Sequence, residues 1–476
     1  MRVAVVFKDR CQPKRCHLEC IAFCPPQRTG TEVIWIDPET TKAAISEETC
    51  ISCGICVRKC PFDAIRIIGL PEALKEDLVH QYGKNAFRLF RLPVPKQGEV
   101  IGLLGPNGIG KTTCVSLLSG EVAPNLGHYR RKKAYWDEVL DYFAGTELHD
   151  YLERIASKKL TTAIKPQYVD KLSKIYTGRV RDLLTKIDKR NRLGDLTASL
   201  DLESFLDRDI AQLSGGELQR MAIAATMLRD ADIYFFDEPS SYLDIYQRLQ
   251  VAKVIQSLSK EKYVVVVEHD LAVLDFLADT VFLMYGEEGA YGIIAQPRPV
   301  RTAINVYLGG YLKEENIRFR DREIRFDTRP PRSDWKGETL VTFDGLTKRF
   351  EGFELTVHPG RLRKGEVVGV VGPNATGKTT FVKMLAGQET PTSGAVEGRW
   401  QVSYKPQYLE AVYEGRSANC FATPSERRRI PATSRRRSSS RSRSKECSSG
   451  TFRRCPAASC SASPSPCVSA GMRTSI

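Results

Sequence analysis

One phosphate-binding motif occurs twice in this chain, each time between an apolar run and a helical pattern. Ile101–Thr113 reads IGLLGPNGIGKTT, and Val368–Thr380 reads VGVVGPNATGKTT. Both contain G-x-x-x-x-G-K-T, in which glycines let backbone N–H groups approach phosphates and the helix N-terminus adds a favourable dipole. Two copies in matched contexts predict two nucleotide-binding α/β domains, each with an apolar strand before its phosphate loop.

The two loops supply most of the predicted nucleotide contacts. Lys111 is expected to reach the β- and γ-phosphates, and Thr112 to ligand Mg²⁺. The residues predicted to bind nucleotide are Gly105, Asn107, Gly108, Gly110, Lys111, Thr112 and Thr113 in the first loop, and Gly372, Asn374, Gly377, Lys378, Thr379 and Thr380 in the second.

Each copy continues into a KPQY segment, at Lys165–Tyr168 and at Lys405–Tyr408. The spacing from the loop lysine to the glutamine is 56 residues in the first copy and 29 in the second. The first copy therefore carries an insertion, centred on about residues 135–157. Its two helical patterns break at Gly145–Thr146 and predict a helix–loop–helix.

Acidic and imidazole side chains follow two further apolar runs. Ile233–Asp237 is a predicted strand that ends in Asp237 and Glu238. Asp237 suits Mg²⁺ and Glu238 could polarise the attacking water, unless both carboxylates merely cap the next helix. Another predicted strand precedes His269, which is well placed for the γ-phosphate, although such a histidine is often structural.

A third element, Leu213–Arg220, reads LSGGELQR and precedes a helical run. Ser214 and the backbone N–H groups of Gly215 and Gly216 form a predicted anion site at a helix N-terminus.

Eight cysteines lie in two runs within residues 1–75, and each run ends in Cys-Pro. The second run has the spacing C-x2-C-x2-C-x3-C-P, typical of two-cluster ferredoxins, in which the fourth cysteine ligates the other cluster. The predicted 4Fe–4S ligands are Cys24, Cys50, Cys53 and Cys56 for one cluster, and Cys11, Cys16, Cys20 and Cys60 for the other. The alternative, two zinc knuckles, suits the run poorly because no histidine interleaves at ligand spacing.

Residues from about 80 to 415 resemble the ATP-binding cassette (ABC) family. Lys111 and Lys378 match its Walker A loops, Ser214–Gln219 its signature, and Asp244 its D-loop. The resemblance implies Gln167 and Gln407 as Q-loop residues that contact nucleotide, with Gln167, Thr112 and Asp237 as Mg²⁺ ligands, and Glu238, His269 and Gln167 as catalytic residues. It also implies that ATP lies between one cassette's Walker A loop and the other's signature.

The fusion of cysteine runs to twin cassettes is similar to the ABC-E family (RNase L inhibitor, the ribosome-recycling ATPases of archaea and eukaryotes). His80–Pro93 resembles that family's adenine-stacking loop, with Tyr82 and Phe87 as the aromatic contacts. Residues 135–157 resemble its ribosome-contacting element. Ser240–Leu249 resembles its D-loop and hinge, except that Tyr246 stands where a basic residue is expected.

This resemblance implies an ATPase that binds the small ribosomal subunit (protein and rRNA) and splits ribosomes, with links to translation initiation and ribosome biogenesis. Release factors are expected partners, and the two clusters would be structural. Two other classes remain open: a redox enzyme in which ATP drives electron transfer, and the ATPase subunit of a membrane transporter. No apolar run approaches the about 20 residues of a membrane helix, so a cytoplasmic protein without a membrane partner is expected.

The last segment departs from the family. Residues 416–476 are rich in Ser, Arg, Pro and Cys, and they hold thirteen basic and two acidic residues, so they account for eleven of the fourteen net positive charges. A base lost near Gly415–Arg416 would explain this, because Pro456–Ala462 in another frame can encode Ser-Gly-Gly-Glu-Leu-Gln-Arg, the missing second signature. The alternative is a genuine Ser/Arg tail that binds RNA.

The predicted fold class is α/β, with P-loop ABC-ATPase cassettes, the second incomplete, after an N-terminal α+β two-cluster ferredoxin-like domain. The expected segments are 1–75 (ferredoxin-like), 76–312 (first cassette), 313–338 (hinge or linker), 339–415 (part of a second cassette) and 416–476 (a disordered, out-of-frame tail).

Overall fold

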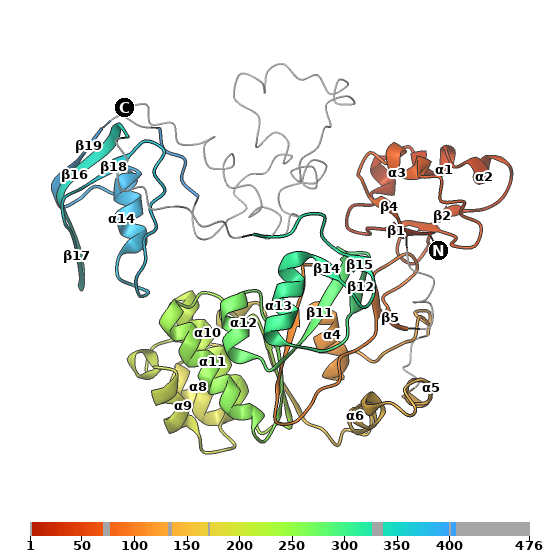
Figure 1. The fold of residues 1–476 in the computed structure, drawn as a ribbon, viewed down its shortest axis with the longest axis horizontal. Coiled ribbons are helices and arrows are strands. Elements are labelled where there is room, and N and C mark those ends of the chain that lie inside the picture. Colours follow the sequence, from red (N-terminus) through yellow and green to blue (C-terminus); the bar gives the residue numbers. More distant parts are fainter. Residues whose placement is uncertain are drawn as a thin grey trace. The chain divides into compact units, whose positions relative to one another are not determined.

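A computed structural model describes residues 2–69, 77–131, 136–169, 172–325, 337–398 and 401–405 (Figure 1). Gln407 and the segment 416–476 lie outside the described residues. The larger of two compact units comprises Met1–Lys8, Cys20–Cys56 and Ile65–Asp327. The remaining segments are described by themselves.

The cysteine-bearing region is built from short elements. Strand β1 (Arg2–Val6) pairs antiparallel with β4 (Ile65–Gly69), and β2 (Ile34–Ile36) pairs antiparallel with β3 (Ala43–Ile45). Its helices are η1 (Pro13–Arg15), α1 (Glu19–Ala22), α2 (Pro25–Arg28) and α3 (Ile55–Lys59). The apolar side chains of β1 are buried, so this strand contributes to the core of the region.

The first cassette is organised around one sheet with the strand order β5-β6-β12-β11-β7-β10-β9-β8, and β13 pairs with β11. The strands are β5 (Leu78–Gln81), β6 (Arg88–Phe90), β7 (Val100–Leu104), β8 (Thr162–Lys165), β9 (Ile233–Asp237), β10 (Tyr263–Val267), β11 (Thr280–Glu287), β12 (Tyr291–Ile294) and β13 (Arg298–Pro299). From β11 to β8 the pairing is parallel. The carboxyl ends of β7, β8, β9 and β10 therefore meet at one edge of the sheet.

Continuous apolar runs form the central strands because both faces of the sheet are covered. On one face, Tyr234 and Phe236 of β9 belong to the core that α8 to α12 complete. On the other face, Ile233 and Phe235 pack in a core with α4, α5 and α6. Figure 1 shows α10, α11 and α12 on one side of the sheet and α4 on the other.

The helices of this cassette are α4 (Lys111–Leu118), α5 (Trp136–Tyr142), α6 (Glu147–Ala156), α7 (Leu172–Ile175), α8 (Val180–Ile187), α9 (Leu193–Ser199), η4 (Glu203–Phe205), η5 (Ile210–Gln212), α10 (Gly215–Met227), α11 (Ile245–Ser259), α12 (Leu271–Leu277) and α13 (Val300–Gly309). The segment expected to form a helix–loop–helix contains α5 and α6. After α13, the short strand β14 (Tyr311–Leu312), at the end of the expected first cassette, pairs antiparallel with β15 (Ile317–Arg318) in the expected linker.

The second cassette segment forms an antiparallel sheet around the long strand β16 (Thr339–Phe350). Its partners are β17 (Phe353–Val357), β18 (Gly360–Arg363) and β19 (Ser393–Gly398), and α14 (Lys378–Leu385) packs on it. The buried core consists of Val341, Phe343, Leu346 and Met384.

One sequence prediction is wrong here: Val367–Val371 does not form the expected strand before the second phosphate loop. Val367 is 92% exposed and Val371 is 82% exposed. In the first cassette the equivalent strand, β7, lies between β10 and β11, which both come much later in the chain. No counterpart of β10 or β11 occurs in the described residues of the second cassette, so this apolar run has no neighbouring strands.

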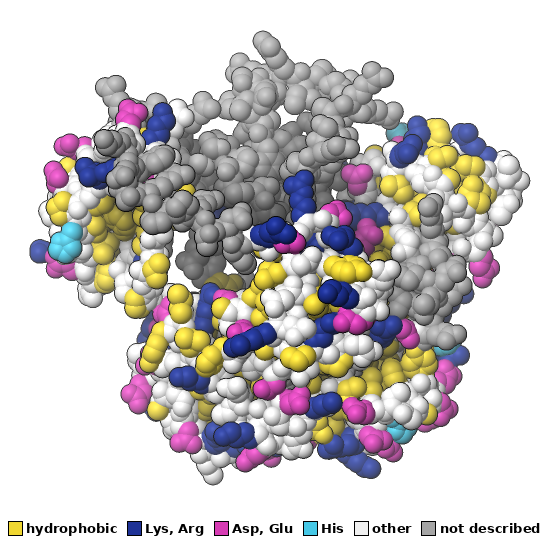
Figure 2. Space-filling model, in the orientation of Figure 1, with side chains coloured by type: hydrophobic (Ala, Val, Ile, Leu, Met, Phe, Trp, Pro, Cys, Tyr) yellow, Lys and Arg dark blue, Asp and Glu magenta, His cyan; other side chains and the backbone are white. Residues whose placement is uncertain are grey.

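Basic and acidic side chains are interspersed over the visible surface of the first cassette (Figure 2). This agrees with the small net charge of the chain outside its last segment. Across the described ranges, no helix has both the length and the apolar character needed to cross a bilayer.

Candidate nucleotide site and cysteine centre

The first phosphate loop joins β7 to α4 through a left-handed glycine. Gly110 has a φ of +92°, and a Cβ there would lie 2.5 Å from Cζ of Phe87, so only glycine fits without a shift. The Lys111 ammonium donates to the carbonyls of Gly105 at 3.0 Å and Pro106 at 2.7 Å. Burial lowers the pKa of Lys111 to about 8, although Glu238 and Asp237 favour the charged form. The carbonyls of the phosphate loop thus hold the Lys111 ammonium inside the loop, where a bound phosphate is expected.

The predicted Mg²⁺ ligands Thr112 and Asp237 are in contact. The Thr112 hydroxyl donates to Oδ2 of Asp237 at 3.2 Å. Burial, followed by the neighbouring Glu238 carboxylate, raises the pKa of Asp237 above its usual value. A hydroxyl and a carboxylate side by side are hard oxygen donors, so this pair fits Mg²⁺.

The structure brings Gln167, Glu238 and His269 together at the carboxyl edge of the sheet. The Gln167 amide nitrogen donates to Oε1 of Glu238 at 2.8 Å, and Nε2 of His269 lies 3.6 Å from the same oxygen. Burial lowers the pKa of His269, and Lys111 adds to this, while Glu238 opposes it. A metal ion would bind the amide oxygen of Gln167. The hydrogen bond from the Gln167 amide nitrogen to Glu238 therefore leaves that oxygen available for the metal.

The backbone of Glu238 is in an unusual conformation for a residue with a side chain. Its φ is +49°, in the left-handed region, which costs roughly 1–3 kcal/mol. Its N–H donates to the carbonyl of Val267 at 2.9 Å. Its carbonyl accepts from Lys165 at 3.3 Å and from the Gln219 amide at 2.8 Å. These contacts hold the Glu238 turn against the relaxation that the strain favours.

Lys165 and Glu268 were not identified from the sequence as site residues. Both side chains are buried, Lys165 with none of its surface exposed. The Glu268 carboxylate accepts from the backbone N–H of Ser240 at 3.2 Å and of His269 at 3.1 Å. Burial raises its pKa to about 7. Two sequence features pointed to these residues. Lys165 belongs to the KPQY segment that occurs in both copies, and Glu268 is the charged residue that directly follows the apolar run of β10.

The predicted signature is the start of α10. Ser214 is its N-cap, and a capping box pairs the Ser214 hydroxyl with the N–H of Glu217 at 3.4 Å, and the Glu217 carboxylate with the N–H of Ser214 at 2.7 Å. Ser214 is exposed, and Gly215 and Gly216 are half-buried. This helix start therefore lies at the surface. At the other end of the motif, Gln219 is buried and links α10 to the Glu238 turn.

The two predicted adenine contacts lie beside the phosphate loop. Tyr82 is 52% exposed, and its hydroxyl donates to the Thr113 hydroxyl at 3.3 Å. Phe87 is half-buried against Gly110, as described above, so Tyr82 presents the more accessible ring.

The loop of residues 82–87 also contacts the two short sheets formed by β1 to β4. Asn85 is 1% exposed; its side-chain amide donates to the carbonyl of Ala4 at 2.9 Å and accepts from the N–H of Ile45 at 2.8 Å. Its backbone carbonyl accepts from the N–H of Val6 at 3.0 Å. Nearby, the Lys84 ammonium lies 3.9 Å from the centre of the Trp35 ring. Residues 82–87 thus contact the phosphate loop with some side chains and the ferredoxin-like sheets with others.

The second phosphate loop has the same local geometry. Gly377 has a φ of +87°, and a Cβ there would lie 3.0 Å from both Phe353 and Leu355. The Lys378 ammonium donates to the carbonyl of Gly372 at 2.7 Å and also to that of Pro373. Gln407, predicted to serve this site, lies outside the described residues.

The eight cysteines lie partly in loops and partly in the short helices α1 and α3. Cys11, Cys24 and Cys56 are buried. The N–H of Ala64 donates to Sγ of Cys60 at 3.4 Å, and burial raises the pKa of the Cys60 thiol, with a smaller effect from the nearby Cys11. No three Cys, His, Asp or Glu side chains converge tightly enough for a single metal ion within the described ranges. The eight cysteines supply an all-thiol donor set in two runs of four, which is the ligand set that 4Fe–4S clusters use.

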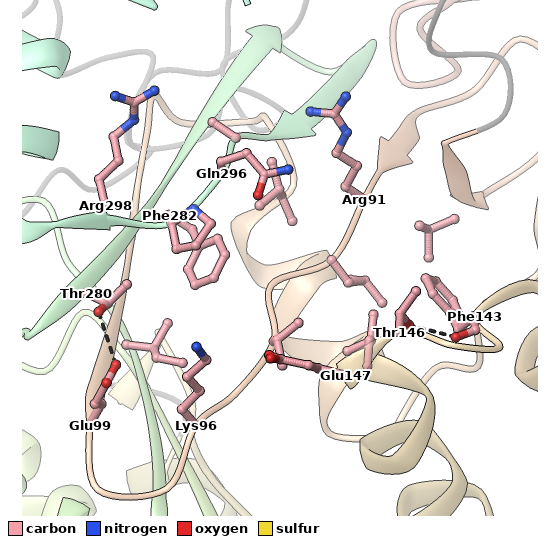
Figure 3. A pocket seen from close by; sticks show the side chains of 18 of the residues that line it. Arg91, Lys96, Glu99, Phe143, Thr146, Glu147, Thr280, Phe282, Gln296 and Arg298 are labelled. Carbon is pink, nitrogen blue, oxygen red and sulfur yellow. Dashed lines mark hydrogen bonds between the residues drawn. The ribbon is translucent and has the colours of Figure 1, made fainter. Parts of the chain in front are cut away.

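A cavity of about 820 Å³ lies elsewhere, between the start of α6, β7 and β11 (Figure 3). Two of its charged side chains have partners: Arg91 pairs with Asp77 and Glu315, and Glu99 accepts from the Thr280 hydroxyl at 3.1 Å. None of its lining residues belongs to the phosphate loop, so it is separate from the nucleotide site.

Comparison with known proteins gave three family matches. The model described as ABC transporter matches residues 94–241 and 358–446, and the second match therefore extends past residue 415. A possible Fer4-like domain in RNase L inhibitor matches residues 1–32, and a 4Fe-4S binding domain matches residues 43–66.

Among curated relatives, an uncharacterized ABC transporter ATP-binding protein of Methanocaldococcus jannaschii is 51% identical over 418 residues, which cover 87% of this chain and 69% of that protein. A translation initiation factor of Saccharomyces cerevisiae is 42% identical over 87% of this chain and 69% of its own length. A solved structure described as ribosome-bound archaeal Pelota and ABCE1 is 53% identical, with a TM-score of 0.83, and covers 88% of this chain and 71% of its own. Another holds an archaeal ribosome recycling factor with a ribosomal stalk protein, at 52% identity and a TM-score of 0.68, over 73% of this chain and 67% of its own.

Proposed function

Because this chain belongs to the ABC-E (RNase L inhibitor) family of ATPases with a 4Fe–4S domain, we propose that it is an ATP-driven ribosome recycling factor. Its relatives include a translation initiation factor and an archaeal recycling factor, and one related structure is ribosome-bound. The proposed partners are the small ribosomal subunit, through its protein and rRNA, and translation termination or release factors. The proposed location is the cytoplasm.

The observation that carries this function is one loop with two sets of contacts. Tyr82 and Phe87 lie against the phosphate loop, while Asn85 bonds to the ferredoxin-like sheets. Nucleotide bound at the first cassette would therefore act on a segment that also positions the cysteine-bearing domain. Because residues 82–87 connect the nucleotide site with the ferredoxin-like sheets, ATP binding could change the position of that domain, as an ATP-driven recycling factor requires.

At the first site, Lys111 would bind the β- and γ-phosphates after release from its two loop carbonyls. Thr112, Asp237 and the Gln167 amide oxygen would hold Mg²⁺, which would neutralise charge on those phosphates. Glu238 would polarise the attacking water, with Gln167 and His269 on its Oε1 to orient it. Tyr82 would stack on adenine, with Phe87 beside the loop.

The second site would use Lys378, Thr379, Thr380 and the loop glycines, with Gln407 as its Q-loop residue. Ser214, Gly215 and Gly216 would face nucleotide bound there, and the exposure of Ser214 is compatible with such a role. The proposed cluster ligands are the two sets that the cysteine spacing predicts. The electrostatic effect of Cys11 on Cys60 supports their assignment to the same cluster. Both clusters would serve to hold the cysteine loops in place.

We also propose that a frame change near residue 415 removed the second signature and Walker B from this chain. The relatives match 87% of it, and the remainder is close to the size of segment 416–476, of which the ABC transporter model matches residues 416–446. The exposed run Val367–Val371 has the same explanation, since the strands that would flank it are encoded later. This copy should therefore hydrolyse ATP feebly, because its first site lacks an opposing signature.

The direct test is co-sedimentation with purified small ribosomal subunits, with and without a non-hydrolysable ATP analogue. We expect binding that increases with the analogue and that is lost in a Lys111→Ala variant. Equal sedimentation with and without the analogue would count against an ATP-driven factor, and no sedimentation in either state would count against ribosome binding.

A further inference from the structure

We propose that Lys165 is a positioning residue that holds the Asp237–Glu238 turn in the shape needed to bind Mg²⁺ with the nucleotide. The inference rests on the nucleotide site proposed above and adds a residue that no motif assigns there. It concerns how the site is built, since Lys165 itself has no exposed surface with which to touch a ligand.

Lys165 is the last residue of β8, and the parallel pairing of β8 with β9 places it opposite Phe236. Its ammonium donates to the carbonyl of Asp237 at 2.8 Å and to that of Glu238 at 3.3 Å. An ammonium has three donors and no acceptor, so it can bind converging carbonyls that no single backbone N–H could satisfy.

A second side chain, from α10, also supports this turn. The Gln219 amide donates to the carbonyls of Glu238 at 2.8 Å and Pro239 at 2.9 Å. Three successive carbonyls, from Asp237 to Pro239, are thus fixed by one side chain from β8 and one from α10. Because Glu238 has a φ of +49°, this turn would relax without such contacts, and the Asp237 carboxylate would move with it.

Nearby carboxylates keep the buried lysine charged. Asp237, Glu238 and Glu268 all raise its pKa, in opposition to burial, which lowers it to about 8. The corresponding lysine of the second KPQY segment, Lys405, is exposed. The printed sequence holds no second Walker B turn for Lys405 to support, so the comparison agrees with a role tied to that turn.

The test measures ATP affinity by calorimetry, with Mg²⁺ and with EDTA, in the full chain carrying Lys378→Ala so that binding reports the first site. In Lys165→Met we expect unchanged affinity in EDTA, because Lys111 and the loop are untouched. The gain in affinity from Mg²⁺ should fall about tenfold, as for other residues that orient metal ligands.

The sign of the change separates positioning from a simple charge effect. Removal of a cation near these three carboxylates would by itself strengthen Mg²⁺ binding, so an increased or unchanged gain in affinity from Mg²⁺ would overturn the proposal. Lys165→Gln, which keeps an N–H donor without the charge, should retain more of the gain than Lys165→Met, and an equal loss in both would also overturn it. Because Gln is less disruptive in a polar site, it serves if the Met variant unfolds.

The control is Lys262→Met. Lys262 lies 3.9 Å from Asp230 and from Asp232, at the other end of the same sheet, so its loss should leave the Mg²⁺ gain unchanged. A parent chain that bound no nucleotide even with Mg²⁺ would contradict the proposed function, whereas normal binding with an unaltered gain in Lys165→Met would contradict only the role of Lys165.

Discussion

At the scale of single residues, Gly110 shows most directly how the phosphate loop depends on its sequence. Alanine there has to accept a φ of +92° and a Cβ 2.5 Å from Phe87. We expect Gly110→Ala to lower the free energy of unfolding by about 2–5 kcal/mol, from left-handed strain and overpacking together, and to abolish ATP binding at the first site.

The matched control is Gly98→Ala. Gly98 has a φ of +90° but nothing within 4 Å of the added Cβ, so only the strain of about 1–2 kcal/mol should appear. Urea unfolding followed by circular dichroism measures both variants. Equal losses would mean that the contact with Phe87 does not constrain the loop.

The buried carboxyl of Glu268 predicts a pH dependence of stability. Its pKa is about 7 in the folded chain against a reference value of 4.5, so the folded state holds the proton more tightly. The cost of ionising it is absent below pH 4.5 and develops as the pH rises through about 7. Relative to Glu268→Gln, the wild type should lose about 2–3 kcal/mol between pH 5 and pH 8.

Urea midpoints of both proteins at the two pH values measure this difference. A constant gap between them would show that Glu268 is ionised throughout the range. Glutamine keeps an oxygen acceptor for one of the two N–H groups, so part of any constant gap reports the lost second contact.

At the scale of elements, the cysteine loops should hold two separate 4Fe–4S clusters. Cys56→Ser removes one predicted ligand in α3 and should lower the bound iron from about eight to about four atoms per chain, with a matching loss of visible absorbance. Cys114, buried in α4 and outside the cysteine runs, is the control, and Cys114→Ser should retain all the iron. Full iron in Cys56→Ser, or zinc in the parent protein, would contradict the ligand assignment.

The loop from Tyr82 to Phe87 predicts that Asn85 holds the ferredoxin-like sheets to the first cassette. Asn85→Ala leaves the N–H of Ile45 and the carbonyl of Ala4 without their partner, at a cost of about 1–3 kcal/mol. Hydrogen exchange at Ile45 should accelerate accordingly, and its response to ATP should disappear.

Asn125 provides the comparison for Asn85. Its side chain accepts from the N–H of Gln81 at 2.9 Å and donates to the carbonyl of Gln81 at 2.8 Å, entirely within the cassette. Asn125→Ala should therefore destabilise β5 without accelerating exchange at Ile45. Acceleration in both variants would mean that the sheets respond to cassette stability in general.

The sequence predicted the elements that its local patterns encode and missed those that depend on distant contacts. The repeat around Lys111 and Lys378, the apolar strands and the cysteine spacing gave the α/β fold class and the cofactors, and both agree with the family matches. Lys165 and Glu268 were missed because the contacts of Lys165 with Asp237 and Glu238, and of Glu268 with Ser240, join residues that are far apart in the chain. Val367–Val371 failed as a strand for the same reason, since a parallel strand needs neighbours.

At the scale of the whole molecule, the positive net charge comes mainly from the last segment of the chain and not from the folded domains. A net charge of +14 invites a nucleic-acid partner, yet eleven of those charges belong to residues 416–476. The case for a ribosomal partner rests on the family membership and on the loop that joins nucleotide site and ferredoxin-like sheets. Resequencing of the gene tests the frame change, and an intact frame with no alternate base would contradict it.

The most direct test of the central claim is ATP-dependent splitting of ribosomes, followed on sucrose gradients with a release factor present. A chain with its second cassette restored by the frame correction should convert ribosomes to subunits with ATP and not without it, and a Lys111→Ala variant should not. The chain with residues 416–476 as they stand should split ribosomes much more slowly, because its first nucleotide site lacks an opposing signature. No conversion by the restored chain, or conversion that is indifferent to ATP, would contradict the assignment as an ATP-driven recycling factor.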